Sequence, residues 1–474
     1  MKLATRYTWS IVLGRVFKKI KRVLKKAAPR FELGIKDLQS SALPLGHAAE
    51  VKNGFHLGDR ISQSKQDVLV ISNGHGEDLI AFRILEELHS QSPGLKLEVL
   101  PLVGEGKVFD KAVSQKWLVK IPLLSRLPSG GFSNQSFRGF LADICAGMVY
   151  LSIKQWIYVR WAARQGRVIL AVGDLLPLVF AWSSGGVFAF VGTPKSDYTW
   201  STAFGSLLSD YFHRIKGTEW DPWECALMRS PRCKFVGTRD KLTARGLRRK
   251  SIKAFAPGNP MMDCFEQIEC PDQLKSCRRL LLLCGSRMPE ALVNLRRLMA
   301  AALQIKTQAP LAILVATGSE PTLKDVELCL KGIGFRSSVL LDNQLQANSL
   351  WEMGLIKVFI GRGKFFDWAP LAEVGLANAG TATEQLVGLG KPCISLPGDG
   401  PQFKKSFAIR QSRLLGGAVM PCQNTRHFAQ SAETLLEDHS LRHKLSIQGV
   451  KRMGNQGGSA VLAAFVLKLL VGHN

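Results

Sequence analysis

The hydrophobic positions of the chain fall into short apolar runs that alternate with polar turns and amphipathic stretches. A first series of strand-like runs covers residues 67–72, 95–103, 167–174, 187–193 and 233–240, and it closes with a strand and an exit turn at 252–263. The run at 67–72 leads through the turn "SNGHGE" into a helical pattern from about Asp78 to Ser90. Short apolar strands separated by helices are typical of a parallel sheet with both faces covered. The pattern therefore predicts a doubly wound, Rossmann-like α/β domain.

A second series of the same kind follows. Its strand-like runs lie at 278–287, 309–319, 357–363, 373–380 and 391–398, and an apolar helix at 459–471 ends the chain. We therefore expect an N-terminal segment and linker at 1–60, a first Rossmann-like domain at 61–265 and a second at 266–474. In two such domains the ligand cleft is expected between them, at the carboxyl ends of the strands.

The N-terminal segment differs from the rest of the chain in its charge. Residues 1–36 contain eleven Lys and Arg against one acid, Glu32, and their apolar residues recur at helical spacing. This pattern predicts a basic amphipathic helix, which would lie on an anionic membrane surface. A disordered basic tail and an organelle transit peptide are the alternatives.

Composition narrows the function classes. The formal net charge is +26, which indicates an anionic partner such as nucleic acid, acidic lipid or a phosphate-rich substrate. The ten cysteines form no CxxC pair, so the sequence suggests neither a zinc site nor a disulfide framework. With no apolar run of 18 residues, we expect a cytoplasmic protein that associates peripherally with membranes and does not cross them.

The first candidate binding motif is "NAGTATEQLVGLGKPCISLPGDGPQ" at 378–402. A strand ends before Gly380, and the small residues Gly380 and Thr381 let a ligand approach the backbone where a helix begins. The free N–H groups and positive end of a helix suit a diphosphate, and Glu384 could accept hydrogen bonds from a ribose. An ordinary strand–turn–helix with a capping threonine is the alternative.

The second candidate motif is "LLLCGSRMPE" at 281–290. Gly285 and Ser286 form a turn after a strand, and Arg287 stands beside the start of the next helix. Arginine is suited to binding two phosphate oxygens at once. The alternative is a surface arginine. Neither this loop nor "SNGHGE" matches the phosphate loop of ATPases, so ATP hydrolysis is not indicated.

Together these motifs resemble the GT-B glycosyltransferases, and more narrowly lipid-A-disaccharide synthase. The matching features are a "GSR" loop at Gly285–Arg287, a "G-x-P" turn at Gly258–Pro260 and a "GTAT-E" turn at Gly380–Glu384. Their order agrees over about residues 67–425. The later "EQ…GKP…GPQ" pattern also resembles the bacterial undecaprenyl-pyrophosphoryl-muramoyl-pentapeptide N-acetylglucosaminyltransferase and glycolipid synthases.

This resemblance implies transfer of a sugar from a UDP-sugar to a lipid-linked acceptor, with inversion and without a metal or other cofactor. The sugar would be an acylated or N-acetylated glucosamine. The donor-binding residues that it implies are Gly285, Ser286, Arg287, Gly380, Thr381, Ala382, Thr383, Glu384 and Gln402. In this assignment Arg287 and the amides of 380–383 hold the diphosphate, Glu384 holds the ribose and Gln402 contacts the sugar.

The acceptor hydroxyl needs a general base in the first domain. His75 follows the first strand, and its imidazole can accept a proton near neutral pH. Asp174 follows the strand at 167–174. A histidine that only hydrogen-bonds its loop and an aspartate that only caps a helix are the alternatives.

The remaining candidates concern the acceptor. Asn73, Gly74 and Gly76 flank His75, and Lys195 and Asp197 follow another strand, so these five residues are predicted to bind the acceptor. A UDP-sugar epimerase on the same fold and a basic nucleic-acid-binding protein are the competing functions, although no signature of specific nucleic-acid binding is found.

Overall fold

A computed structural model describes residues 68–74, 76–123, 148–201, 208–340, 342–398 and 403–471. The predicted N-terminal basic helix lies outside these ranges, as do His75 and Gln402. The two sheets and the helices that cover them lie within the described ranges.

The six runs of the first series, together with one strand that was not predicted, β3, form a parallel sheet of seven strands in the order β3-β2-β1-β4-β5-β6-β7. The strands are β1 (Val68–Ser72), β2 (Leu97–Pro101), β3 (Leu118–Lys120), β4 (Val168–Gly173), β5 (Phe188–Gly192), β6 (Cys233–Thr238) and β7 (Ala254–Phe255). Strand β1 pairs with β2 on one side and β4 on the other. The prediction of a doubly wound sheet is confirmed.

Helices of the first domain follow these strands. They are α3 (Gly76–Gln91), α4 (Asp110–Ser114), α6 (Met148–Arg164), α7 (Leu175–Ser183), α8 (Tyr198–Ser201), α9 (Leu208–Lys216), α10 (Pro222–Met228) and α11 (Lys241–Arg248). Helix α3 buries Ile80, Ile84 and Leu88 at helical spacing against the sheet. Glu77 and Asp78 lie in its first turn, where negative charge suits the helix dipole.

The second series forms a sheet of eight strands in the order β10-β11-β12-β9-β8-β13-β14-β15. The strands are β8 (Arg278–Leu283), β9 (Leu311–Thr317), β10 (Arg336–Ser338), β11 (Ser349–Met353), β12 (Ile356–Arg362), β13 (Val374–Ala377), β14 (Cys393–Ser395) and β15 (Val419–Pro421). The edge strand β10 pairs antiparallel with β11, which pairs antiparallel with β12. The sequence did not predict β10, β11 or β15, because these strands are short or contain polar residues.

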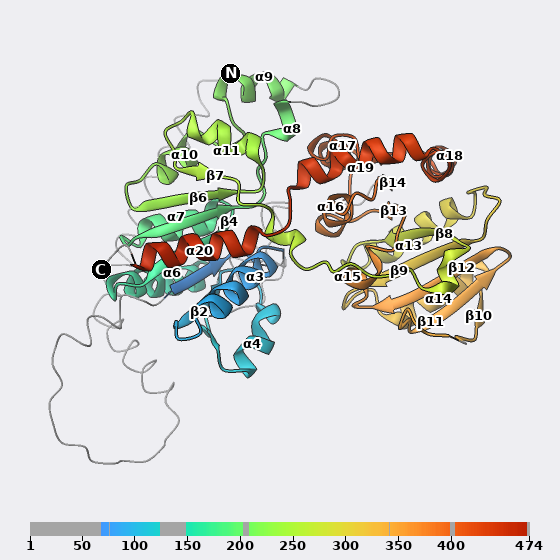
Figure 1. Cartoon of the computed structure of the whole chain (residues 1–474), viewed down its shortest axis with the longest axis horizontal. Helices are drawn as coiled ribbons and strands as arrows, with labels where there is room; N and C mark the ends of the chain where they lie inside the picture. The colour runs from blue at the N-terminus through green and yellow to red at the C-terminus, as the bar shows by residue number, and fades with distance from the viewer. Residues whose placement is uncertain are drawn as a thin grey trace, which may run out of the picture. The chain divides into compact units, whose positions relative to one another are not determined.

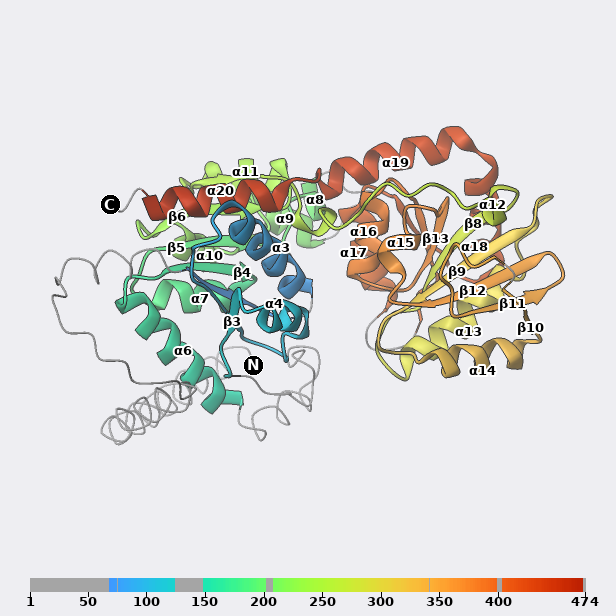
Figure 2. The same cartoon turned by 60° about the horizontal axis from the view of Figure 1, so that its bottom comes forward.

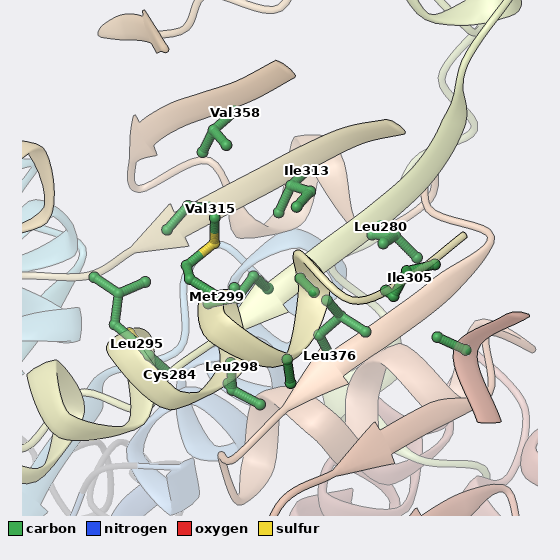
Figure 3. Close-up of a cluster of buried hydrophobic side chains, with 14 of the residues drawn as sticks. Leu280, Cys284, Leu295, Leu298, Met299, Ile305, Ile313, Val315, Val358 and Leu376 are labelled. Atoms are coloured by element: carbon green, nitrogen blue, oxygen red, sulfur yellow. The ribbon is translucent and has the colours of Figure 1, made fainter. Parts of the chain in front are cut away.

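The second core lies between this sheet and its helices. Figure 3 shows Leu280 of β8, Ile313 and Val315 of β9 and Leu376 of β13 grouped with Leu295 and other residues of α13 (Glu290–Ala302), and these side chains are buried. The other helices are α12 (Asp272–Lys275), α14 (Leu323–Ile333), α15 (Phe365–Trp368), α16 (Thr381–Gly388), α17 (Lys405–Leu414), α18 (Thr425–Glu437) and α19 (His439–Met453). None of the helices in the described ranges is long and apolar enough to cross a membrane.

The last helix, α20 (Gly458–Val471), belongs to the first domain by packing. Its residues Leu462, Ala463 and Val466 join the core formed by β1, β2, β4 and α3, and it lies beside α3 in both views (Figures 1 and 2). The predicted extent of the second domain, 266–474, is corrected here. The apolar pattern marked a buried helix but carried no information about which sheet it covers.

The chain passes between the two domains twice, and the two passages are bonded together. Asn259, in the predicted "G-x-P" turn, donates from its backbone N to the carbonyl of Asn455 at 2.8 Å and from Nδ2 to the carbonyl of Met453 at 2.8 Å. Gly258 has φ +113°, and a Cβ there would lie 2.9 Å from the carbonyl oxygen of Asn455. Only glycine fits this conformation and contact.

Both sheets reverse their strand order at one point. In the first sheet this point lies between β1 and β4, and in the second between β8 and β13. Ligands of doubly wound sheets bind outside the carboxyl ends of the strands at such reversals. The "SNGHGE" loop and Asp174 occupy the first reversal, and the "GSR" and "GTAT" turns occupy the second.

Candidate functional site

The two predicted donor motifs meet at the strand reversal of the second sheet. Gly285 has φ +91°, and its Cβ position lies 3.4 Å from the backbone oxygen of Asn378. The loop after β8 and the turn after β13 are therefore in contact. The sequence separates these two motifs by more than 80 residues, so their contact supports the prediction that they serve one site.

Asn378 holds this arrangement together. Its buried side chain donates from Nδ2 to Asn294 Oδ1 at 3.1 Å and to the carbonyl of Leu396 at 2.8 Å, and it accepts from the N–H of Leu396 at 3.0 Å. Asn294 in turn donates to the carbonyl of Cys284, just before Gly285. The two amides of Asn378 and Asn294 thus join the segments that follow β8, β13 and β14. The sequence did not predict this role for Asn378, because its partners are distant along the chain.

Helix α16 begins directly after this turn. Gly380 is its N-cap residue and has no side chain to cap the first N–H groups. Gln411 of α17 donates to the carbonyls of Ala379 and Gly380 at 3.2 Å each, and Thr383 Oγ1 donates to the Ala379 carbonyl at 2.7 Å. These bonds fix the carbonyls away from the helix end. The amides of Thr381, Ala382 and Thr383 open the helix, a geometry that favours an anion.

The cationic residue of the donor motif is half-buried. Burial lowers the pKa of Arg287 from its usual value, while the nearby Glu290 acts in the opposite direction. An arginine keeps its charge in such a setting. Gly285 and Ser286 separate Arg287 from the buried strand β8, so the motif brings a positive charge to the strand ends.

Glu384, the predicted ribose ligand, has a partner from the other domain. Arg239 Nη2 lies 2.9 Å from Glu384 Oε2, and both side chains are largely buried. Arg239 follows β6 and lines a small pocket with Thr193, Thr238 and Asn259. The sequence did not predict a role for this arginine, which stands among several other basic residues between 238 and 250.

The first domain contributes the start of α3 to the same region. The Cβ position of Gly76 lies 3.4 Å from Oγ1 of Thr381, so the beginnings of α3 and α16 face each other. Gly74 has φ +92°, and a Cβ there would lie 2.7 Å from the backbone oxygen of Val103. Asn73 is half-buried at the end of β1. His75 lies outside the described residues, whereas Gly74 and Gly76 on either side of it are described.

Glu77 is an acidic residue of this region for which the sequence predicted no functional role. Its Oε1 accepts a hydrogen bond from Thr193 Oγ1 at 3.2 Å, at the carboxyl end of β5. Burial raises the pKa of Glu77 to about 7, and repulsion from Asp174 and Asp78 adds to the effect. In the sequence Glu77 has the pattern of a first-turn acid, which suits the helix dipole and gives no sign of burial.

Asp174 caps α7. Its Oδ1 accepts a hydrogen bond from the N–H of Leu176 at 3.0 Å, which is the alternative role that the sequence left open. It is only partly buried and its charge acts on Glu77. Asp174 therefore belongs to the same group of side chains, and its part in catalysis stays a prediction.

The two residues predicted after β5 are engaged within the first domain. Lys195 pairs with Glu224 at 2.5 Å and Asp221 at 3.4 Å. Asp197 is 2% exposed and accepts from Thr218 Oγ1 and the Glu219 N–H. Its burial raises its pKa to about 6. These contacts stabilise the loop, and acceptor binding by Lys195 and Asp197 stays a prediction.

Comparison with known proteins shows similarity of fold to solved structures at low sequence identity. No protein-family model matches the sequence. No curated protein matches it either. Among solved structures, MnaA of S. aureus with UDP superposes with a TM-score of 0.53 at 13% identity, over 86% of this chain and 97% of that one.

Two further structures are similar. One from Listeria monocytogenes, assigned as a UDP-N-acetylglucosamine 2-epimerase, has a TM-score of 0.51 at 12% identity and covers 86% and 96% of the two chains. The glycosyltransferase of kitacinnamycin has a TM-score of 0.50 at 13% identity, and the match covers 85% of this chain and 99% of that one. The chain therefore has the GT-B architecture of two Rossmann-like domains, which it shares with UDP-N-acetylglucosamine 2-epimerases and glycosyltransferases.

Proposed function

We propose that this protein transfers a sugar from a UDP-sugar to a lipid-linked acceptor with inversion, in the manner of the lipid-A-disaccharide synthase that its motifs resemble. The observation that carries this proposal is the assembly made by Asn378. Through Asn294 and Cys284 it links the segment just before the "GSR" loop to the turn that precedes α16 at a strand reversal, and Gly76 of the first domain lies against this helix start.

The diphosphate of the donor would lie between Arg287 and the amides of Thr381, Ala382 and Thr383. When the bond between the sugar C1 and the diphosphate oxygen breaks, negative charge develops on that oxygen. A guanidinium and a helix N-terminus stabilise such charge without moving. Gly285 and Ser286 keep the loop backbone close to the ligand, and Gln402 is proposed to contact the sugar.

Glu384 is proposed to hold the ribose. Its carboxylate already bonds to Arg239, which fixes the orientation of one oxygen. A carboxylate has several acceptor positions, so it can bind Arg239 and a ribose hydroxyl together. In this arrangement a residue of the first domain orients a donor-binding residue of the second.

The acceptor is proposed to bind at the carboxyl ends of β1, β4 and β5, beside Asn73, Gly74 and Gly76. Its hydroxyl would attack the sugar C1 from the face opposite the diphosphate and pass its proton to a base. We place the base at Glu77, because its half-buried carboxyl group accepts a hydrogen bond from Thr193 and the residue directly follows Gly76 in the chain. A carboxyl group with a pKa of about 7 is suited to general base catalysis at neutral pH. His75 and Asp174 are the alternatives.

A UDP-sugar epimerase is the second candidate, favoured by the similarity to the structure from Listeria monocytogenes that is assigned as a UDP-N-acetylglucosamine 2-epimerase. Products separate the two functions. The protein is incubated with several UDP-sugars, with and without a total lipid extract, and the products are identified by mass spectrometry. Transfer predicts a glycosylated lipid only when lipid is present. A new UDP-sugar formed without lipid identifies the epimerase and contradicts transfer.

A further inference from the structure

Helix α9 has its polar and apolar faces reversed. The side chains that it turns toward the protein are Asp210, His213 and Lys216, spaced three residues apart. Asp210 pairs with Arg413 at 2.5 Å, His213 Nε2 lies 3.5 Å from Glu219, and Lys216 pairs with Asp221 at 2.7 Å. The inward face is thus held by charged contacts, whereas an ordinary surface helix buries an apolar face.

The outward face of α9 is apolar and aromatic. Tyr211 is 72% exposed, Phe212 59% and Ile215 70%, and Arg214 is exposed beside them. Three large apolar side chains within five residues form a patch, whereas singly scattered apolar residues need no explanation. Helix α9 lies next to α8 (Figure 1).

We infer that the outward face of α9 docks on an anionic lipid bilayer. Aromatic and aliphatic side chains with adjacent cations are the composition of helices that lie in a membrane interface. Arg214 is exposed on this face and supplies the cation. A symmetric contact with a second copy would bring like charges at Arg214 together, which disfavours a dimer. The inference does not depend on the proposed sugar transfer.

The charged inward face connects this surface to the donor turn. Asp210 and Arg413 are 5% and 4% exposed, and Arg413 Nε also donates to the carbonyl of Thr199. Arg413 belongs to α17, the helix whose Gln411 bonds to the carbonyls of Ala379 and Gly380. A bilayer bound at α9 would therefore lie at a fixed position relative to the start of α16.

The test uses the full chain and vesicles of phosphatidylcholine with about 30% phosphatidylglycerol. Binding is measured by co-sedimentation at low salt and at about 0.5 M salt, where purely electrostatic attachment is screened. We expect the substitutions Tyr211→Ser, Phe212→Ser and Ile215→Ser together to lower vesicle affinity at least about tenfold at high salt. These side chains are exposed, so thermal unfolding should be unchanged.

A matched triple variant provides the control. Leu328, Val339 and Leu355 are 57%, 74% and 64% exposed in the second domain, and replacing them by serine should leave vesicle binding as in the wild type. Two results would overturn the inference. One is an α9 variant that binds vesicles like the wild type. The other is a wild type that is dimeric without lipid and becomes monomeric in the α9 variant, since the face would then be a dimer contact.

Discussion

Arg239 and Glu384 form an ion pair with an Nη2–Oε2 distance of 2.9 Å that joins the end of β6 in the first domain to α16 in the second. The guanidinium also contacts Met453 Sδ at 3.1 Å, close to where the chain returns to the first domain. One arginine thus contacts the predicted ribose ligand and lies beside the connection between the domains. We expect this pair to contribute both to stability and to donor binding.

Arg239→Met should destabilise the protein by about 1–3 kcal/mol, because it leaves the largely buried carboxylate of Glu384 without its partner. Glu384→Gln should have a smaller effect, and the double variant should be more stable than the sum of the two single effects indicates. Denaturant unfolding of all four proteins measures the coupling. Strictly additive effects would show that the ion pair contributes nothing.

Arg287→Ala should weaken UDP binding by about 1.5–3 kcal/mol, since it removes a charge-assisted contact to the diphosphate. Titration calorimetry with UDP measures this change. Arg336→Ala is the control, because Arg336 is an exposed arginine of the same domain on the edge strand β10. Equal UDP affinities of the Arg287 variant and the wild type would remove Arg287 from the site.

Asn378→Ala should lower the free energy of unfolding by about 2–3 kcal/mol, because it leaves the N–H and the carbonyl of Leu396 without their buried partner. It should also weaken UDP binding, although Asn378 is assigned no contact with the ligand. Asn294→Ala removes one link of the same network and should cost less. A stable Asn378 variant with normal UDP affinity would contradict the positioning role.

Glu77→Gln should lower the transfer rate by about two to four orders of magnitude, the usual contribution of a general base. In the wild type, kcat/KM should rise with pH and level off above about 7, where Glu77 becomes ionised. Asp174→Asn should retain most activity, since asparagine also caps a helix. The reverse pattern, with Asp174→Asn inactive and Glu77→Gln active, would assign the base to Asp174.

The raised pKa of Glu77 also affects stability, and we expect stability to fall with rising pH whereas kcat/KM rises. The pKa of this carboxyl group rises from 4.5 to about 7 on folding, so the folded state binds more protons than the unfolded state in this range. Wild-type stability should therefore fall as pH rises from 4.5 to 7. At about pH 8, Glu77→Gln should be more stable than the wild type by about 1–2 kcal/mol. An unchanged unfolding temperature at that pH would contradict the burial of Glu77.

Much of the fold could be predicted because its strands are apolar runs of the length that a buried parallel strand requires. The two motifs predicted to bind the donor could be located in the sequence, since glycine, arginine and a helix start at a strand end have a recognisable spacing. Their role in donor binding stays a prediction. The strands β3, β10, β11 and β15 were missed because they are short or contain polar residues. The position of α20 was missed because burial alone does not specify the partner.

The candidate site was less predictable where it depends on contacts between distant segments. Arg239 reads as part of a basic stretch, and only its contact with Glu384, 145 residues away along the chain, distinguishes it. Glu77 reads as a favourable first-turn acid until burial against Thr193 is seen. The charge pattern of α9 is visible in the sequence, but which face of the helix is covered is not.

The return of α20 to the first sheet has a consequence for how this protein can be divided. A gene fragment that stops at the predicted boundary, residue 265, would encode the first sheet without the helix that supplies Leu462 and Val466 to its core. Such a fragment should expose apolar surface and aggregate. Separate production of this domain would need α20 attached, for instance as a fusion or as a circular permutant that places residues 458–471 next to β1.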